Sequence, residues 1–176
     1  MYGKTRGFSL LSLLSSLAII AILLGIGLPS MASLVTTNRL NTQVNQLAGA
    51  LTFARTEAIT RNQHVIICKS QDQLQCSKDA AWHEGWLVFV DDNQNYQYDN
   101  NELVLLKNGM MQTNLHIEYA GFGSYAYVTF RPAGSTSSNG TFTLCDTTAT
   151  DSPRAVIINR AGRIRTSTTK LEGTAL

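Results

Sequence analysis

The chain has 176 residues, enough for one domain of ordinary size and an appended segment. Its formal net charge is +2, which excludes a strongly basic or strongly acidic protein, so any charge argument about a partner must be local. The histidines His64, His83 and His116 are isolated from one another, and the common nucleophile, phosphate-loop and zinc-protease motifs do not occur. We therefore predict that the protein is not an enzyme and holds no cofactor and no metal.

The first feature along the chain is an uncharged segment that runs from Phe8 to Leu28 and follows Lys4 and Arg6. A helix of this length spans roughly 30 Å, which matches the hydrocarbon core of a bilayer. A cleaved signal peptide has a shorter apolar region of about 7–15 residues. Because the basic residues precede the segment, the positive-inside rule predicts a cytoplasmic N-terminus and an external C-terminal part. We expect a retained membrane helix over 8–29.

An amphipathic helix is predicted over 30–62. Its apolar residues recur at alternating intervals of four and three and form one stripe, which predicts a face that packs on a soluble domain. This stripe consists of Leu40, Val44, Leu47, Leu51, Ala54 and Ala58. Arg39, Arg55 and Arg61 fall largely on other faces, and we interpret them as solvated helix charges.

The remainder, 63–176, has the pattern of a β-rich domain. Short apolar or alternating runs are separated by turns rich in Asn, Asp, Gly and Ser. The runs predict strands at 64–68, 85–91, 102–107, 115–120, 125–130, 140–145, 154–159 and 163–167. We therefore predict an α+β fold in which one long N-terminal helix packs on an antiparallel β-sheet.

The opening "RGFSLL…AIIAILLGIGLP" resembles the class III signal of type IV pilins and pseudopilins. The resemblance implies that prepilin peptidase removes a leader of residues 1–7 by cutting between Gly7 and Phe8, that Phe8 is then N-methylated, and that the apolar helix is kept. Further stretches, including "GWLVFVD" and "INRAGRIR", resemble the FimT/GspH branch of minor pseudopilins. This implies a type IV pilin-like fold and other pilins as partners. It also implies a single-pass inner-membrane protein whose C-terminal domain lies in the periplasm or at a pilus tip.

One position departs from the family pattern. The fifth residue after the cut is usually Glu, which pairs with the N-terminal amine of a neighbouring subunit, whereas this chain has Ser12. A serine hydroxyl can bond to a backbone carbonyl one turn back and needs no charged partner. We interpret Ser12 as the mark of a subunit that occupies a filament tip or is scarcely incorporated. Neutral variation at one position is the alternative.

Basic residues gather near the C-terminus with no Asp or Glu between them: Arg154, Arg160, Arg163, Arg165 and Lys170. If 163–167 is a strand, Arg163 and Arg165 point to one face, and Gly162 makes the preceding turn possible. Clustered guanidinium groups suit phosphate oxygens and bind them without reading sequence.

The Gly-Arg-x-Arg ending is similar to that of FimT proteins that bind DNA during natural transformation. The resemblance implies a DNA-binding site that comprises Arg154, Arg160, Gly162, Arg163, Arg165 and Lys170. The alternative is a structural subunit of a type IV pilus or a type II secretion pseudopilus, in which the same residues form a solvated basic edge strand.

Three cysteines permit one disulfide, which a location outside the cytoplasm allows. Cys68 and Cys76 bracket a short polar loop and are the favoured pair, with Cys145 as the competing partner.

The segment 91–102 has oxygen ligands at the spacing of a calcium-binding EF-hand loop. The position that should be Gly is Tyr96, and strands are expected on either side. We therefore predict a polar hairpin loop and not a calcium site.

Overall fold

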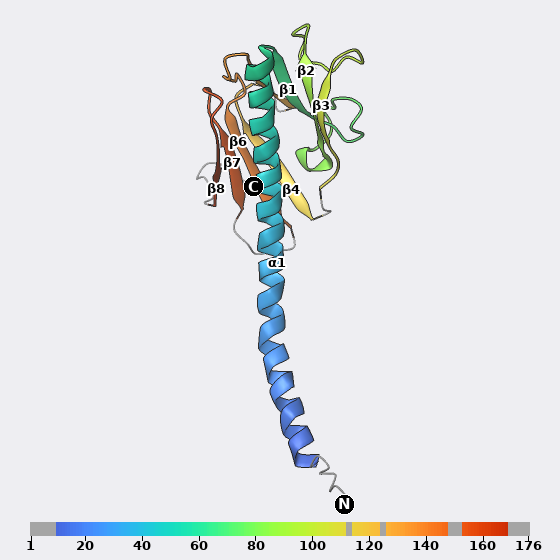
Figure 1. The fold of residues 1–176 in the computed structure, drawn as a ribbon, viewed down its shortest axis with the longest axis vertical. Coiled ribbons are helices and arrows are strands. Elements are labelled where there is room, and N and C mark those ends of the chain that lie inside the picture. The colour runs from blue at the N-terminus through green and yellow to red at the C-terminus, as the bar shows by residue number, and fades with distance from the viewer. Residues whose placement is uncertain (1–9, 112–113, 124–125, 148–152, 169–176) are drawn as a thin grey trace, which may run out of the picture. The chain divides into compact units, whose positions relative to one another are not determined.

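The computed structural model describes residues 10–111, 114–123, 126–147 and 153–168, apart from the side chains of 26–33. The chain divides into two compact units, Met1–Thr37 and Asn38–Leu176. One long helix, α1 (Leu10–Arg61), passes from the first unit into the second (Figure 1).

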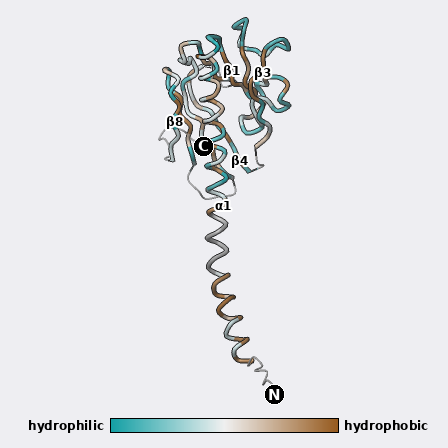
Figure 2. The backbone as a smooth tube through the Cα atoms, in the orientation of Figure 1, coloured by the Kyte–Doolittle hydropathy of each residue, from teal (hydrophilic) through white to brown (hydrophobic). Residues whose placement is uncertain are grey.

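The first unit is formed by the N-terminal part of α1, where apolar residues are concentrated (Figure 2). Its leucine and isoleucine side chains between 10 and 24 are all exposed. Within the described residues, no helix is both long and apolar enough to span a membrane. The predicted membrane helix over 8–29 includes Phe8 and Ser9, which lie outside the described residues, and positions 26–29, whose side chains are not described.

Hydroxyl groups in this part of α1 bond to the helix backbone. Ser15 Oγ donates to the carbonyl of Ser12 at 3.0 Å, and Ser16 Oγ donates to the carbonyl of Leu13 at 2.9 Å. These two hydroxyls are thus satisfied within the helix and need no charged partner.

The second unit has α1 as one side of its core. The predicted stripe is buried along its whole length, from Leu40 at 1% exposed to Ala58 at 0%. The helix ends at Arg61, because Asn62 adopts a left-handed φ of 53° and the amide of Gln63 donates back to the carbonyl of Ala58. Asn is one of the few residues that tolerate this conformation at a helix end.

Within the described ranges, eight antiparallel strands follow in two sheets and not in the single sheet that the sequence predicted. The first sheet has the order β3-β2-β1-β5 and the second β4-β6-β7-β8. The strands of the first sheet are β1 (His64–Lys69), β2 (Trp86–Asp91), β3 (Val104–Asn108) and β5 (Tyr127–Phe130). Those of the second are β4 (Leu115–Gly121), β6 (Gly140–Asp146), β7 (Arg154–Ile158) and β8 (Ile164–Ser167). A short 3-10 helix, η1 (Trp82–Glu84), was not predicted.

Alternate residues of both sheets form one core with α1. Val65 and Ile67 of β1 and Phe142 and Leu144 of β6 are each completely buried there. Full burial of such a side chain contributes about 1.5–3 kcal/mol. The fold is therefore α+β with a long N-terminal helix packed on antiparallel sheets, as predicted.

The first sheet is covered on its other face as well. Ile66, Cys68, Leu87 and Phe89 form a second apolar cluster, against which Cys76 and Tyr98 pack. Two loops, 70–79 and 92–101, supply these covering side chains. This explains why β2 is buried at every position and reads in the sequence as a continuous apolar run.

Candidate nucleic-acid interface

Three of the basic residues near the C-terminus, Arg160, Arg163 and Arg165, lie on the hairpin of β7 and β8. The Gly162 amide donates to the Asn159 carbonyl at 2.8 Å, and the Asn159 amide donates to the Arg163 carbonyl at 3.2 Å. The Asn159 side chain adds a third bond, because its Oδ1 accepts from the Arg163 amide at 2.9 Å. These bonds fix the backbone of the turn 159–163 independently of the arginine side chains.

Gly162 is required by close backbone packing. Its φ is +72°, in the left-handed region that favours glycine. A Cβ atom at this position would lie 1.9 Å from the carbonyl oxygen of Gly134 and 3.0 Å from Nε of Arg55. The turn therefore rests directly on the 131–135 loop and on α1.

Arg55 of α1 holds these two segments together. Its Nε donates to the carbonyl of Gly134 at 2.9 Å, and its Nη2 donates to the carbonyl of Ala161 at 3.3 Å. The carbonyl of Arg160 also accepts from the Thr136 amide at 3.0 Å. The interpretation of Arg55 as a solvated helix charge was wrong, because the guanidinium spans two loops that are distant in sequence.

Three arginine side chains extend from this turn and from β8. Arg160, Arg163 and Arg165 are exposed, and within the described part of the chain none of them forms an ion pair. The register pairs Ile158 with Ile164 and Ile157 with Arg165. Since Ile164 packs against the shared core, the alternation of β8 places Arg165 on the other face of the strand. Arg163 lies in the turn, one residue before β8 begins.

A fourth arginine, Arg131, begins the loop on which Gly162 rests. Its amide donates to the Ser135 carbonyl at 2.9 Å, and its carbonyl accepts from the Gly134 amide at 2.7 Å. Its side chain is exposed. Nothing local to the run "RPAG" indicates that this loop meets the 159–163 turn.

The structure does not bring Arg154 to the same surface. Arg154 pairs with Leu144, whose side chain is in the core, so it lies on the α1 side of the sheet. Its Nε donates to Oδ1 of Asn41 in α1 at 3.2 Å. Lys170, Gly7 and Phe8 lie outside the described residues. The arginines that the structure brings together are therefore Arg160, Arg163 and Arg165, which we call the arginine patch, and Arg131 begins the loop on which the turn rests.

The cysteines follow the favoured pairing. Cys68 and Cys76 form a disulfide with an S–S distance of 2.03 Å, and Cys145 is a thiol on β6. The disulfide closes a loop at the end of β1 and lies on the other sheet from the arginine patch.

The 91–102 segment is held together by its own hydrogen bonds. Asp91 accepts from the amides of Asn95 and Tyr96, and Glu102 accepts from the amides of Asp92 and Asp99. Burial raises the pKa of Glu102, partly offset by those amide bonds, and the charges of Asp91 and Asp99 raise it further. Two buried carboxylates thus fold a polar loop, as the sequence predicted.

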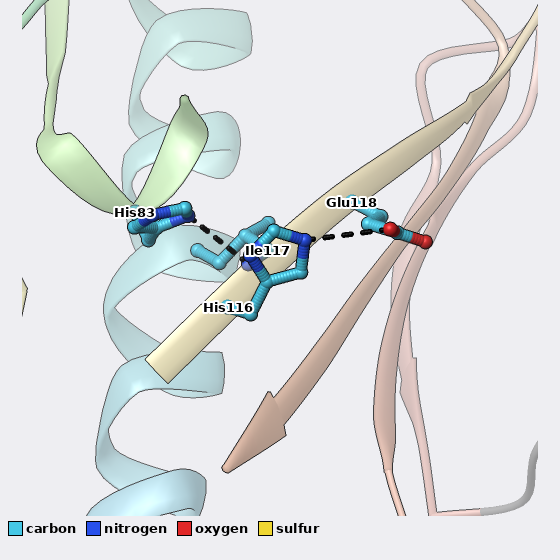
Figure 3. A network of polar contacts seen from close by, with 4 residues as sticks. All are labelled: His83, His116, Ile117 and Glu118. Atoms are coloured by element: carbon cyan, nitrogen blue, oxygen red, sulfur yellow. Dashed lines mark hydrogen bonds and ion pairs between the residues drawn. The ribbon is translucent and has the colours of Figure 1, made fainter. Parts of the chain in front are cut away.

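Two histidines that the sequence analysis treated as isolated come together. The rings of His83 in η1 and His116 in β4 lie 4.9 Å apart (Figure 3). His83 Nδ1 accepts from the amide of Ile117 at 3.5 Å, and His116 Nε2 lies 3.4 Å from Glu118 Oε1. Burial lowers the pKa of His83, and the His116 ring lowers it further. Across the ranges that the structure describes, no cluster of three or more His, Cys, Asp and Glu side chains is placed to hold a metal ion.

Residues 43–162 match the family described as "Type II transport protein GspH". The pilin-like protein PilA1 of Thermus thermophilus is 34% identical over 166 residues, which cover 91% of this chain and 97% of that protein. The type IV minor pilin FimU of Pseudomonas aeruginosa has a similar structure, with a TM-score of 0.59 at 21% identity over 76% of this chain and 92% of FimU. The minor pseudopilin EpsH from the Type 2 Secretion System of Vibrio cholerae gives a TM-score of 0.54 at 10% identity, covering 74% of this chain and 97% of EpsH.

Proposed function

This chain belongs to the GspH family of minor pilins and pseudopilins, and we propose that it binds extracellular DNA through the arginine patch for uptake in natural transformation. The observation that carries the proposal is the β7–β8 turn. It presents Arg160 and Arg163 from a backbone that is fixed by other groups, and Arg165 follows two residues later on β8. A rigid display of guanidinium groups is what non-specific phosphate binding requires.

The charge environment supports binding to an anion. Within the described residues, the side chains of Arg160, Arg163 and Arg165 have no hydrogen-bond or ion-pair partner in the protein, and no carboxylate neutralises them. They can therefore bind phosphate oxygens without first breaking a contact within the protein. If the three residues neutralise three phosphates, the logarithm of affinity should fall with the logarithm of salt concentration at a slope of about −2.7.

The N-terminal segment completes the proposal. Under this proposal, prepilin peptidase cuts between Gly7 and Phe8, and Phe8 becomes the methylated N-terminus. The helix over 8–29 then anchors the chain in the inner membrane. The second unit then lies in the periplasm or at a pilus tip beside other pilins. Ser12 would need no counter-ion in such a position.

A second candidate function is assembly of a pilus or of a type II secretion pseudopilus through protein contacts alone. The description of the matched family, a type II transport protein, favours this candidate. The arginine patch would then keep the β8 edge solvated, and DNA affinity would be absent.

The test is a titration of the full chain in detergent micelles with a short fluorescent DNA duplex at several salt concentrations. An Arg163→Gln/Arg165→Gln variant should lose most of the affinity, and its salt slope should fall to about −1. A matched variant, Arg39→Gln/Lys107→Gln, removes the same charge from exposed positions elsewhere and should bind as the wild type does. Equal binding by both variants, or no binding by the wild type at low salt, would refute DNA capture and leave the assembly role.

A further inference from the structure

A pocket of about 210 Å³ lies between the disulfide loop 70–79 and the 92–101 loop, beside the end of β1 and the start of β5. It is on the first sheet, whereas the arginine patch is largely on the second. Among the described residues, three tyrosines line it, Tyr96, Tyr98 and Tyr127, together with the disulfide itself. Its size suits one ring of a ligand and not a drug-sized molecule, which needs about 300 Å³ or more.

The aromatic rings of the pocket are held in place by each other. Tyr96 stacks on Tyr127 with ring centroids 5.7 Å apart and an angle of 14° between the rings. Tyr98 meets Phe89 edge-on at 5.3 Å. Tyr96 is nevertheless 43% exposed, so one wall of the pocket is an accessible aromatic surface.

The backbone of both loops adopts a conformation that is unfavourable for these residues. Gln73, Gln94 and Tyr96 have φ values of about 60°. Apart from Asn62 at the helix end, they are the non-glycine residues with positive φ in the described ranges. A bulky residue in this region is rare, and such strain is concentrated at ligand sites.

The rest of the structure holds this strained wall rigid. The carboxylate of Asp91 accepts from the Tyr96 amide at 3.2 Å, and the Cys68–Cys76 disulfide closes the facing loop. A wall that is fixed before the ligand arrives loses less conformational entropy on binding.

Polar groups around the pocket have no protein partner, in contrast to their neighbours. In the same two loops, the side-chain amides of Gln71, Asn93 and Asn95 donate to carboxylates of Glu84 and Asp99. Among the described residues, no partner is found for five groups that line the pocket: the amides of Gln75 and Gln97, the Lys78 ammonium, and the hydroxyls of Tyr96 and Tyr98. Amides and phenols both donate and accept hydrogen bonds, so they suit a ligand that does the same.

We propose that this pocket binds one sugar residue of a glycan. The C–H face of a pyranose packs on an aromatic ring, and its hydroxyls exchange hydrogen bonds with Gln75, Gln97 and the phenols. No arginine is among the described lining residues, so the pocket lacks the two-pronged donor that favours phosphate binding. Lys78 supplies one positive charge, which suits a single acidic substituent on the sugar. The proposal does not depend on DNA binding, because the pocket and the arginine patch share no residue.

The test is saturation-transfer NMR on the full chain in micelles of a detergent without a sugar headgroup. The probes are N-acetylglucosamine, galactose and glucuronic acid. Adenosine monophosphate and phenylalanine are tested in parallel, because they represent a nucleobase and an aromatic side chain as alternative ligands. We expect transfer from tyrosine protons to at least one of the three sugars, with a dissociation constant on the order of 1 mM.

Two substitutions in one loop give a matched comparison. Tyr96→Gly removes the aromatic wall while placing glycine where φ is 63°, so it should weaken sugar binding at least tenfold without unfolding the loop. Gln94→Gly relieves the same kind of strain at an exposed residue that does not line the pocket, and it should bind as the wild type does. If Tyr96→Gly loses its near-UV circular dichroism, Gln75→Ala/Gln97→Ala takes its place, because neither side chain has a partner to lose.

The proposal is overturned if none of the three sugars shows transfer to the wild type. It is also overturned if Tyr96→Gly, or the double variant in its place, binds sugar with unchanged affinity. Transfer to adenosine monophosphate or phenylalanine without transfer to a sugar would assign the pocket to a nucleobase or an aromatic side chain instead.

Discussion

Replacing Gly162 with alanine tests whether close backbone packing builds the β7–β8 turn. The left-handed φ of +72° costs a non-glycine residue about 1–2 kcal/mol. The new Cβ would also lie 1.9 Å from the carbonyl oxygen of Gly134, well inside the contact distance of about 3.5 Å, so the turn must move away. That movement would weaken the bonds from Arg55 to Ala161 and from Thr136 to Arg160, at about 1 kcal/mol each. We expect the free energy of unfolding to fall by about 2–4 kcal/mol.

The assay is urea unfolding of the full chain in micelles, followed by the fluorescence of Trp82 and Trp86, which are both buried. Gly49→Ala is the control, because Gly49 lies in α1 and a Cβ there would meet nothing within 4 Å. This substitution should raise the free energy of unfolding by about 0.5–1 kcal/mol. If Gly162→Ala unfolded within about 0.5 kcal/mol of the wild type, the turn would not be built by this packing and the reasoning would fail.

Three further predictions concern other contacts. Arg55→Ala should lower the free energy of unfolding by about 1–3 kcal/mol, because two carbonyls lose their donor. Arg55→Lys should recover only part of this lost stability. Urea unfolding measures both variants. Because the folded state lowers the pKa of His83, the unfolded state binds more protons, so stability should fall as pH decreases below about 6.5. A His83→Gln variant should flatten this pH dependence, and an unchanged profile would count against a role for the half-buried His83. Cys68→Ser/Cys76→Ser should cost about 2–3 kcal/mol, since the disulfide closes a loop with a sequence separation of 8, and thermal unfolding should show a matching loss.

The helix and the strands were predictable because their patterns are local. The stripe from Leu40 to Ala58 repeats with the helical period, and the strand runs alternate or are bounded by turn residues. The division into two sheets was not predictable in this way. It depends on β1 pairing with both β2 and β5, and on β4 pairing with β6, and these partners are distant in sequence. The 3-10 helix is only three residues long and leaves no periodic signal.

The candidate site was predictable only where its residues are neighbours in the chain. Arg160, Arg163 and Arg165 share one turn and one strand, so their spacing was sufficient. Arg55 lies 79 and 106 residues from the carbonyls it binds, and no local pattern indicates such contacts. Arg154 was grouped with the others by charge alone. Its side of the sheet is set by the register with β6, which the sequence does not show.

The hydrogen bonds that fix the backbone of the β7–β8 turn do not involve the arginine side chains that the turn exposes. The shape depends on the backbone of residues 159–163, on the Asn159 side chain, on Gly162, and on Arg55 from the helix. The side chains at 160 and 163 contribute nothing to it, since only their backbone groups are bonded. Residues at these two positions are therefore free to change during evolution, or in the laboratory, without a loss of folding. A subunit of this architecture can gain, lose or exchange what it binds by point substitutions on a frame that stays the same.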